Sequence, residues 1–534
     1  MMDPPKMCVG DEVFVQYVFD NTDHNAKTLD GNRTFHCLGR LAAFTPESGV
    51  TIEGSSKKCK KMPSAAQLAS CCNVETVPYR GKQNTGLKTI TFDDVSTLLR
   101  NDSTQLPTHY LLYLSGKSIF EKELPSWRGF MEVLSLYLPQ DNVSRIVCLP
   151  FINEPPSKYT SINTAIVHAM AECKQLKQKT CIVTFDQPLF IKATEIVAGN
   201  DEMKNVVVRL SGFHMLMSFL GSIGNIMDGS GLEDIWGTVY ASESVKNMMT
   251  GKSFSRAIRA HMLTYTSIGK YFYKYMADEL SLFDRNKYET FVRLQLTHWN
   301  ENPPSYNFCQ NDITLKEMTE VFLYKLNSLK SNGPTAKLFI QYFEMVTIAL
   351  QFIEAELLGN WQLHLQSVKK MLPYFHASGY FLYAKSAQIY LQSMIKLEME
   401  MDDEEYRLFT QEGYFTIRRS YKAWSGIWSD MTIEQTLNRF FGTDLIHGSV
   451  TPSVVARYLS CMPTSFAVMD SLETYSELHS NTSEQHVDLS ISRLTKDNKD
   501  LQAMTSWLEK HKPFELRDYL TSLSTGIIGR DDIN

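Results

Sequence analysis

The chain has 534 residues, of which 43% are hydrophobic and 21% charged, which is an ordinary globular composition with ample material for a large core. Its formal net charge is −6. A protein dedicated to nucleic acids gains most of its affinity by neutralising phosphates, so this balance argues against a strong, stand-alone DNA-binding module. A basic groove on a mildly acidic body remains compatible with it.

The ten cysteines are scattered along the chain, and we expect them to be reduced. Cys59, Cys71 and Cys72 lie in a polar stretch, but no second pair at zinc-ligand spacing accompanies them. We therefore expect no zinc.

No segment of the sequence predicts a membrane span or a secretory signal. The N-terminal residues lack an apolar core, and the most apolar long stretch, 206–227, is interrupted by Arg209 and His214. We expect an intracellular protein with no membrane partner.

The first third of the chain alternates strand and helix signals. Residues 12–20 (EVFVQYVFD) and 33–44 (RTFHCLGRLAAF) predict two strands joined by a turn at Leu29-Asp30-Gly31-Asn32. A loop-rich insertion near 50–100 follows, and residues 143–153 predict another short buried strand.

Residues 161–177 have helical periodicity, and two further strands follow. KTCIVTFDQP (179–188) ends its apolar run at Asp186, and NVVVRLSGFH (205–214) predicts a buried strand that ends near His214. With a helix expected over 190–198, this β-α-β-α-β order predicts an α/β layer.

After Gly231 the pattern changes to long amphipathic helices. We expect helices over 256–283, 285–298, 315–329, 336–358, 361–372, 380–398 and 428–441. The polar tail from 476 predicts a peripheral helix or partial disorder. With no clear linker, we expect one composite body: a core over 1–235, a helical insertion over 236–420, the remainder of the core over 421–475, and the tail over 476–534.

Two carboxylates, Asp20 and Asp186, each end an apolar run. Side chains at strand ends of an α/β sheet converge on one crevice, where carboxylates bind hard divalent cations. Aspartate after a strand is also a common turn or helix-capping residue, and this simpler interpretation stays open. His214 is equally compatible with a hydrogen-bonded core histidine, and Glu434 with a residue that favours the start of its helix.

Several stretches resemble a multicopy, transposable-element-derived family found widely in invertebrate genomes, whose biochemistry is not established. The resemblance covers most of 12–465, in the same order. The stretches are FVQYVFDNTDHNAKTLDGNRTFH (14–36), IVTFDQPLFIKATEI (182–196), NVVVRLSGFHMLMSFLGSIG (205–224), GNWQLHLQSVKKMLPYF (359–375), SGYFLYAKSAQIYLQSM (378–394) and YKAWSGIWSDMTIEQTLNR (421–439).

That family is similar, more distantly, to hAT-type transposases. The resemblance implies a ribonuclease-H-like (RNase H-like) mixed sheet with flanking helices, interrupted by a large all-helical insertion. It also implies that Asp20, Asp186 and Glu434 are catalytic carboxylates holding Mg²⁺ or Mn²⁺, with the histidine of Gly212-Phe213-His214 nearby. Asp23, Glu354 and Glu356 are rival carboxylates.

The resemblance implies DNA as a partner, a nuclear location and, for an active enzyme, a homo-oligomer. Candidate DNA contacts are His214, Arg418, Arg419, Lys422 and Arg439, although a solvated surface also explains the four basic residues. The zinc-finger region expected upstream in full-length transposases is absent, which favours a truncated or repurposed copy. The leading hypothesis is a transposase-derived protein that cleaves and transfers DNA strands. The alternatives are a domesticated, non-enzymatic interaction or oligomerisation protein and an inactive relic.

Overall fold

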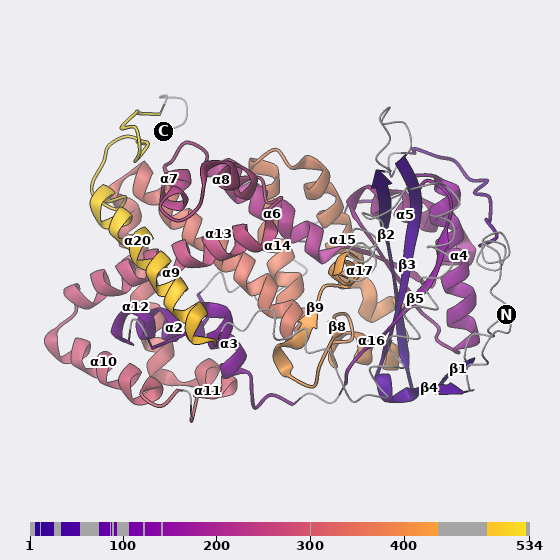
Figure 1. Ribbon diagram of the computed structural model, residues 1–534, viewed down its shortest axis with the longest axis horizontal. Coiled ribbons are helices and arrows are strands. Elements are labelled where there is room, and N and C mark those ends of the chain that lie inside the picture. The colour runs from indigo at the N-terminus through magenta and orange to yellow at the C-terminus, as the bar shows by residue number, and fades with distance from the viewer. Residues whose placement is uncertain are drawn as a thin grey trace.

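The computed structural model describes twelve parts of the chain, and every structural statement below refers to them. They are residues 6–10, 12–25, 34–53, 74–85, 87, 90–92, 95, 106–120, 123–139, 142–299, 301–435 and 489–529. They form a mixed α/β molecule with a sheet at one end and a large helical region at the other (Figure 1). The expected fold class is confirmed at this level.

The main sheet has five strands in the order β5-β3-β2-β6-β7. Strands β2 and β3 are antiparallel, as are β3 and β5, whereas β2, β6 and β7 run parallel. The parallel half places three strand ends at one edge, where an α/β sheet commonly binds its ligands. The bounds are β2 Phe14–Asn25, β3 Thr34–Thr45, β5 Arg145–Ile152, β6 Cys181–Phe185 and β7 Val206–Leu210.

The expected strands are confirmed, except that β7 stops at Leu210, short of His214, and that β2 is longer than expected. The prediction ended this strand at Asp20, but β2 continues to Asn25 because all twelve of its residues pair with β3. Its pairing with β6 stops earlier, at Phe19. Asp20 therefore follows the last residue of the parallel ladder, although it lies inside a longer strand.

Helices cover both faces of the sheet. Helix α4 (Tyr159–Gln175) lies on its outer side, with α5 (Gln187–Ala198) packed on β6 and β7. The short helix α17 (Ser429–Ile433) packs on β2, β3 and β6 from the side of the helical region (Figure 1). Small two-stranded sheets are β1 (Lys6–Val9) with β4 (Val50–Glu53), and β8 (Ile417–Arg418) with β9 (Gly426–Ile427).

The helical region is built around α13 (Pro334–Leu358), which is long and apolar enough to cross a membrane. Its most apolar window is 83% buried inside the protein, so α13 serves as a core helix here. The other helices are α6 (Gly212–Ile226), α7 (Leu232–Gly237), α8 (Ser242–Met249), α9 (Phe254–Glu279), α10 (Leu282–Leu296), α11 (Tyr306–Asn311), α12 (Ile313–Leu329), α14 (Trp361–Ala377), α15 (Phe381–Glu400) and α16 (Asp403–Thr410). Short 3₁₀ turns are Glu47–Gly49, Asp201–Met203, Lys330–Asn332 and Ala423–Ser425.

Besides α6 and most of α7, segments far outside the expected insertion also belong to this region. Helix α2 (Thr108–Phe120) packs on α9, α10 and α12, and it is followed by α3 (Trp127–Leu134). Helix α20 (Ile491–His511) packs along α9, where Arg259 binds both Asp497 and Asp500. From residue 489 to 529 the tail is therefore an integral layer of the helical region, shown in yellow in Figure 1. Residues 476–488 lie outside the described residues.

Gly333, the residue before α13, packs against the backbone of the tail at Arg517. Its φ of +113° is one that L side chains rarely adopt, and an added Cβ would lie 1.8 Å from the Arg517 carbonyl oxygen. We expect Gly333→Ala to destabilise the protein by about 1–3 kcal/mol and to expose residues 512–529 to limited proteolysis. Gly237→Ala is the control, because an added Cβ there meets nothing within 4 Å. Equal proteolysis of the two variants would contradict this role of Gly333.

Candidate metal centre

The parallel strands bring Asp20 and Asp186 to the same level of the sheet. Phe19 of β2 pairs with Phe185, the last residue of β6, so Asp20 and Asp186 are the residues that follow this pair. Across β2, Asp20 pairs with Gly39 of β3, where the β3–β5 ladder is irregular. An irregular ladder bends the strand locally and is common beside functional sites.

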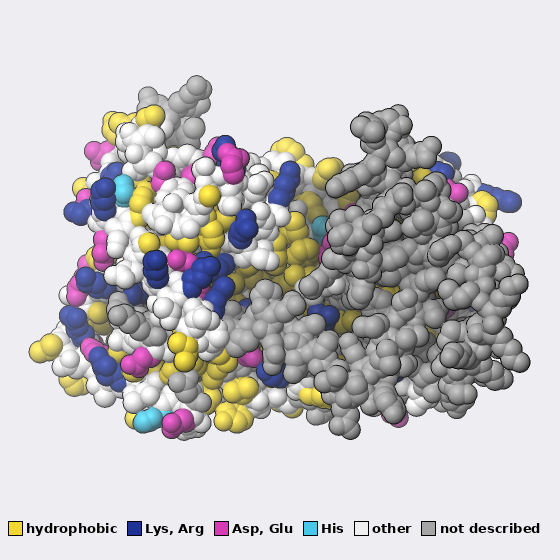
Figure 2. All heavy atoms as spheres, viewed as in Figure 1, with side chains coloured by type: hydrophobic (Ala, Val, Ile, Leu, Met, Phe, Trp, Pro, Cys, Tyr) yellow, Lys and Arg dark blue, Asp and Glu magenta, His cyan; other side chains and the backbone are white. Residues whose placement is uncertain are grey.

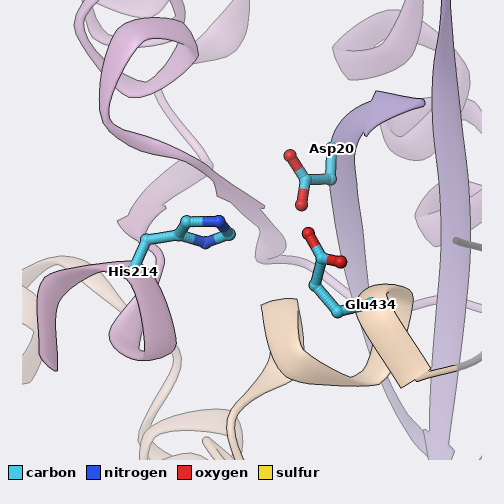
Figure 3. A group of neighbouring side chains, drawn as sticks. All are labelled: Asp20, His214 and Glu434. Carbon is cyan, nitrogen blue, oxygen red and sulfur yellow. The ribbon is translucent and has the colours of Figure 1, made fainter. Parts of the chain in front are cut away.

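His214 and Glu434 form a group with Asp20 at this edge, and Asp186 is not one of its members. Ligand atoms of Asp20, His214 and Glu434 all lie within 4.8 Å of one another. Figure 3 shows the three side chains converging from β2, from the first turn of α6 and from the turn that follows α17. His214 therefore lies in a helix and not at the end of a strand, because β7 stops at Leu210 and α6 begins at Gly212.

Asp20 is a buried carboxylate that lacks a full set of hydrogen bonds. Its side chain is 4% exposed, and its Oδ1 accepts a hydrogen bond from the Asn21 N–H at 2.7 Å. Its Oδ2 is buried without a hydrogen-bond partner among the described residues. Burial, followed by the negative charge of Asp186, raises the pKa of Asp20 well above its ordinary value. Such a group is costly to ionise unless a cation accompanies it.

Asp186 combines two roles. Its Oδ1 accepts a hydrogen bond from the Leu189 N–H at 3.2 Å and so caps α5, which bears out the simpler interpretation of this residue. Its charge also acts on Asp20 and His214, so it belongs to the same electrostatic group. Burial raises the pKa of Asp186.

A fourth carboxylate, Asp430, was not predicted as a site residue. It is 2% exposed, and it accepts hydrogen bonds from the Phe213 N–H and the His214 N–H, each at 3.1 Å. Its Oδ2 lies 3.0 Å from His214 Nδ1. Asp430 precedes Glu434 by four residues, a spacing that places both on one helix face and could have identified it.

These charges decide the protonation of His214. Burial lowers the pKa of His214, but the hydrogen bond and charge of Asp430, with the charges of Asp20 and Asp186, outweigh this and raise it to about 9. The same His214 contacts lower the pKa of Asp430 despite its burial. His214 thus carries a proton in the absence of metal. A metal ion would have to displace a proton from the imidazole, because the two compete for it.

The donor set fits a divalent cation. Neighbouring and opposite ligands of an octahedral ion at about 2.1 Å lie roughly 3–4.2 Å apart, so the observed group needs only a small contraction. Two carboxylates and an imidazole suit Mn²⁺ or a similar ion, and carboxylates alone suit Mg²⁺. The unpartnered Asp20 oxygen is the atom that such an ion would satisfy.

The rival carboxylates Glu354 and Glu356 lie elsewhere, buried in α13. Glu354 accepts from Tyr110 Oη at 2.7 Å, and Glu356 lies 2.7 Å from His364 Nδ1. Of Asp23, the structure describes only its backbone in β2, paired with His36 of β3.

The four basic candidates lie in different environments. Arg418 is buried and donates to the Leu358 and Glu412 carbonyl oxygens, so it is not placed for a phosphate. Arg419 is exposed and donates to Gln435 beside Glu434, and Lys422 is exposed and pairs with Glu132. Arg439 lies outside the described residues.

Comparison with known proteins identifies one family. The family described as "Domain of unknown function (DUF8702)" matches residues 126–534, which is more than half of the chain. The matched segment contains Asp186, His214, Asp430 and Glu434, whereas Asp20 precedes it. No curated protein and no solved structure matches the chain.

Proposed function

The chain belongs to the DUF8702 family, and we propose that it is a transposase-derived protein whose core binds DNA and performs metal-dependent strand cleavage and transfer. Asp20, Asp186 and Glu434 are the proposed catalytic and metal-binding carboxylates. The proposal also assigns an RNase H-like fold to the sheet and its flanking helices.

One observation carries this proposal. Side chains that are more than 400 residues apart in sequence, Asp20 and Glu434, lie within 4.8 Å of His214 and of each other, and a buried oxygen of Asp20 has no partner among the described residues. Burial beside other carboxylates makes the ionised form of Asp20 costly unless a positive charge accompanies it. A binding site for a cation explains its retention.

The order of the elements supports the proposed fold. The first aspartate is at the end of the parallel ladder of β2, the second follows β6, and the histidine follows β7. The helical region then intervenes, and the glutamate follows α17. This is the order that the resemblance to hAT-type transposases implies.

The proposed reaction is an in-line displacement at phosphorus. When bound, divalent metal would activate the attacking oxygen and stabilise the leaving oxygen. Water first breaks the bond between phosphorus and the 3′ oxygen, leaving a 5′-phosphate and a 3′-hydroxyl. The 3′-hydroxyl then attacks the phosphorus of a second phosphodiester and displaces its 3′ oxygen, which leaves as a new 3′-hydroxyl. In this scheme Asp20, Asp186 and Glu434 bind and neutralise positive charge, and Asp430 orients His214 beside them.

DNA would approach a surface of mixed charge. Figure 2 shows Lys, Arg, Asp and Glu side chains interspersed over the helical region on the face in view, with no broad basic patch there. Arg419 donates to Gln435, the residue after Glu434, and is the exposed cation best placed to meet a phosphate. A homo-oligomer and a nuclear location are part of the same proposal.

The test compares two aspartates that cap helices in the same way. Asp186 accepts from Leu189 N and Asp312 accepts from Leu315 N, each three residues ahead. We expect Asp186→Asn to reduce Mn²⁺-dependent cleavage of element-end DNA by more than about a hundredfold, because metal-ligand sites lose 10–100-fold even when an outer partner is removed. Asp312→Asn should keep its cleavage rate, because asparagine caps a helix about as well as aspartate does and both variants therefore retain their caps.

The alternative is a non-enzymatic interaction protein, which the acidic net charge favours. It predicts no cleavage by the wild-type chain with any divalent ion. Equal cleavage by wild type and Asp186→Asn would contradict the catalytic proposal.

A further inference from the structure

Asp430 fixes the orientation of His214 through three contacts. Both of its carboxylate oxygens accept backbone N–H groups at the start of α6, and Oδ2 also lies 3.0 Å from His214 Nδ1. With Nδ1 occupied in this way, Nε2 is the nitrogen that remains for a further ligand. Figure 3 shows the outer edge of the ring turned toward Asp20 and Glu434.

Asp430 also connects two members of the group. It lies in α17, one helical turn before Glu434, so a single rigid turn carries Glu434 and the carboxylate that orients His214. Its 2% exposure means that this contact is shielded from water and that the carboxylate has little freedom to move. Metal-binding histidines are commonly hydrogen-bonded to a carboxylate through their other ring nitrogen. The carboxylate sets the orientation of the ring and raises the basicity of the nitrogen that binds the metal.

We propose that His214 binds the metal directly through Nε2, that Asp430 is its positioning residue, and that the centre consequently takes Mn²⁺ in preference to Mg²⁺. This inference rests on the proposed metal-binding function. Mg²⁺ prefers oxygen ligands and holds its water tightly, whereas a first-row transition ion accepts an imidazole among carboxylates. A site made of carboxylates alone has no nitrogen ligand and would lack this source of preference for Mn²⁺.

The experiment measures metal binding by the full chain, stripped of metal and without DNA. Mn²⁺ is titrated and followed by electron paramagnetic resonance, and electron spin-echo modulation reports a directly bound ¹⁴N nucleus. We expect the modulation in the wild type and its loss in His214→Leu, with Mn²⁺ affinity at least about tenfold weaker. His376→Leu, which removes an exposed histidine at the end of α14, is the matched control and should bind as the wild type does.

Asp430→Asn should weaken Mn²⁺ binding about 10–100-fold in the wild-type background. In the His214→Leu background the same change should have less than about a threefold effect, because Asp430 acts through the imidazole. Displacement of Mn²⁺ by Mg²⁺ should need a large excess of Mg²⁺ in the wild type and a smaller excess in His214→Asp, which offers a carboxylate instead.

The outcomes separate this inference from the proposed function. If Asp20→Asn abolishes Mn²⁺ binding while His214→Leu keeps wild-type affinity, the ligand assignment is overturned and the metal centre stands. If the wild type binds no Mn²⁺, both are overturned. Should His214→Leu fail to fold, ¹⁵N-histidine labelling of the wild type decides, since an unchanged ¹⁴N modulation would contradict direct ligation by histidine.

Discussion

Replacing Asp20 with asparagine is expected to stabilise the metal-free protein while reducing DNA cleavage by more than about a hundredfold. The side chain is 4% exposed, its Oδ2 has no partner among the described residues, and the charges of Asp186 and Glu434 act on it. Removing a buried negative charge from this group relieves both desolvation and repulsion. The expected gain is about 1–3 kcal/mol, seen as a rise of a few degrees in Tm.

The loss of cleavage has a separate cause. Asparagine keeps the shape of the side chain but supplies a weaker ligand and no charge to balance a cation. Loss of a residue that only hydrogen-bonds to a metal ligand costs 10–100-fold, and loss of a direct ligand should cost more. Melting is measured in the presence of a chelator and cleavage in the presence of Mn²⁺. Asp278→Asn is the control, because that carboxylate is 55% exposed and belongs to a surface ion pair with Arg285. An Asp20→Asn chain that melts lower and still cleaves would contradict both halves of the prediction.

Glu354→Gln is expected to destabilise the protein by about 3 kcal/mol without changing its affinity for Mn²⁺. Glu354 is 1% exposed in α13, and its carboxylate accepts hydrogen bonds from Tyr306 and, at 2.7 Å, from Tyr110, while His109 Nε2 lies 3.2 Å away. These partners come from α11 and α2, so the carboxylate joins three helices. Neutralising it leaves three buried groups facing a weaker acceptor.

Urea denaturation measures this loss as a lower midpoint. Glu320 is an exposed carboxylate of α12 that lines a cavity together with Glu354. Glu320→Gln should change stability by less than about 0.5 kcal/mol. Unchanged stability in Glu354→Gln, or weakened Mn²⁺ binding, would contradict the assignment of Glu354 to structure.

The pH dependence of this effect has a definite sign. Burial raises the pKa of Glu354, but His109 and the two tyrosines outweigh it and lower the pKa below its ordinary value. A lowered folded-state pKa stabilises the fold above the unfolded-state value, about 4.3, and this contribution is lost as the pH falls through the folded-state pKa. The difference between wild type and Glu354→Gln should therefore be full at neutral pH and shrink in acid.

Much of the sheet could be predicted because its signals are local. The apolar runs that end at Asp20 and Asp186 are visible in the sequence, and strand ends of a parallel sheet necessarily meet at one edge. The continuation of β2 to Asn25 could not be predicted, because residues 21–25 are polar and are ordered as strand by pairing with β3. Pairing with the partner strand, and not the intrinsic strand propensity of these residues, determines their conformation.

The site was predicted less completely because some of its contacts are distant. Asp430 lies in the first turn of α17, but its carboxylate accepts N–H groups at the start of α6, more than 200 residues earlier in the chain. Capping preferences identify a suitable residue but not the helix that it will serve. In the same way, the polar sequence of α20 did not reveal that Arg259 would bind Asp497 and Asp500 and hold it to α9.

The wide separation of Asp20 and Glu434 has a consequence for a chain still being synthesised. Translation adds about 5–20 residues per second, so roughly 20–80 s pass between the two residues. Until the ribosome has released α17, the N-terminal strands carry their aspartates without the glutamate and without the Asp430 clamp on His214. A nascent or prematurely terminated polypeptide thus contains the sheet but an incomplete set of donors. Only a chain that extends through Glu434 can bring Asp20, His214 and Glu434 together.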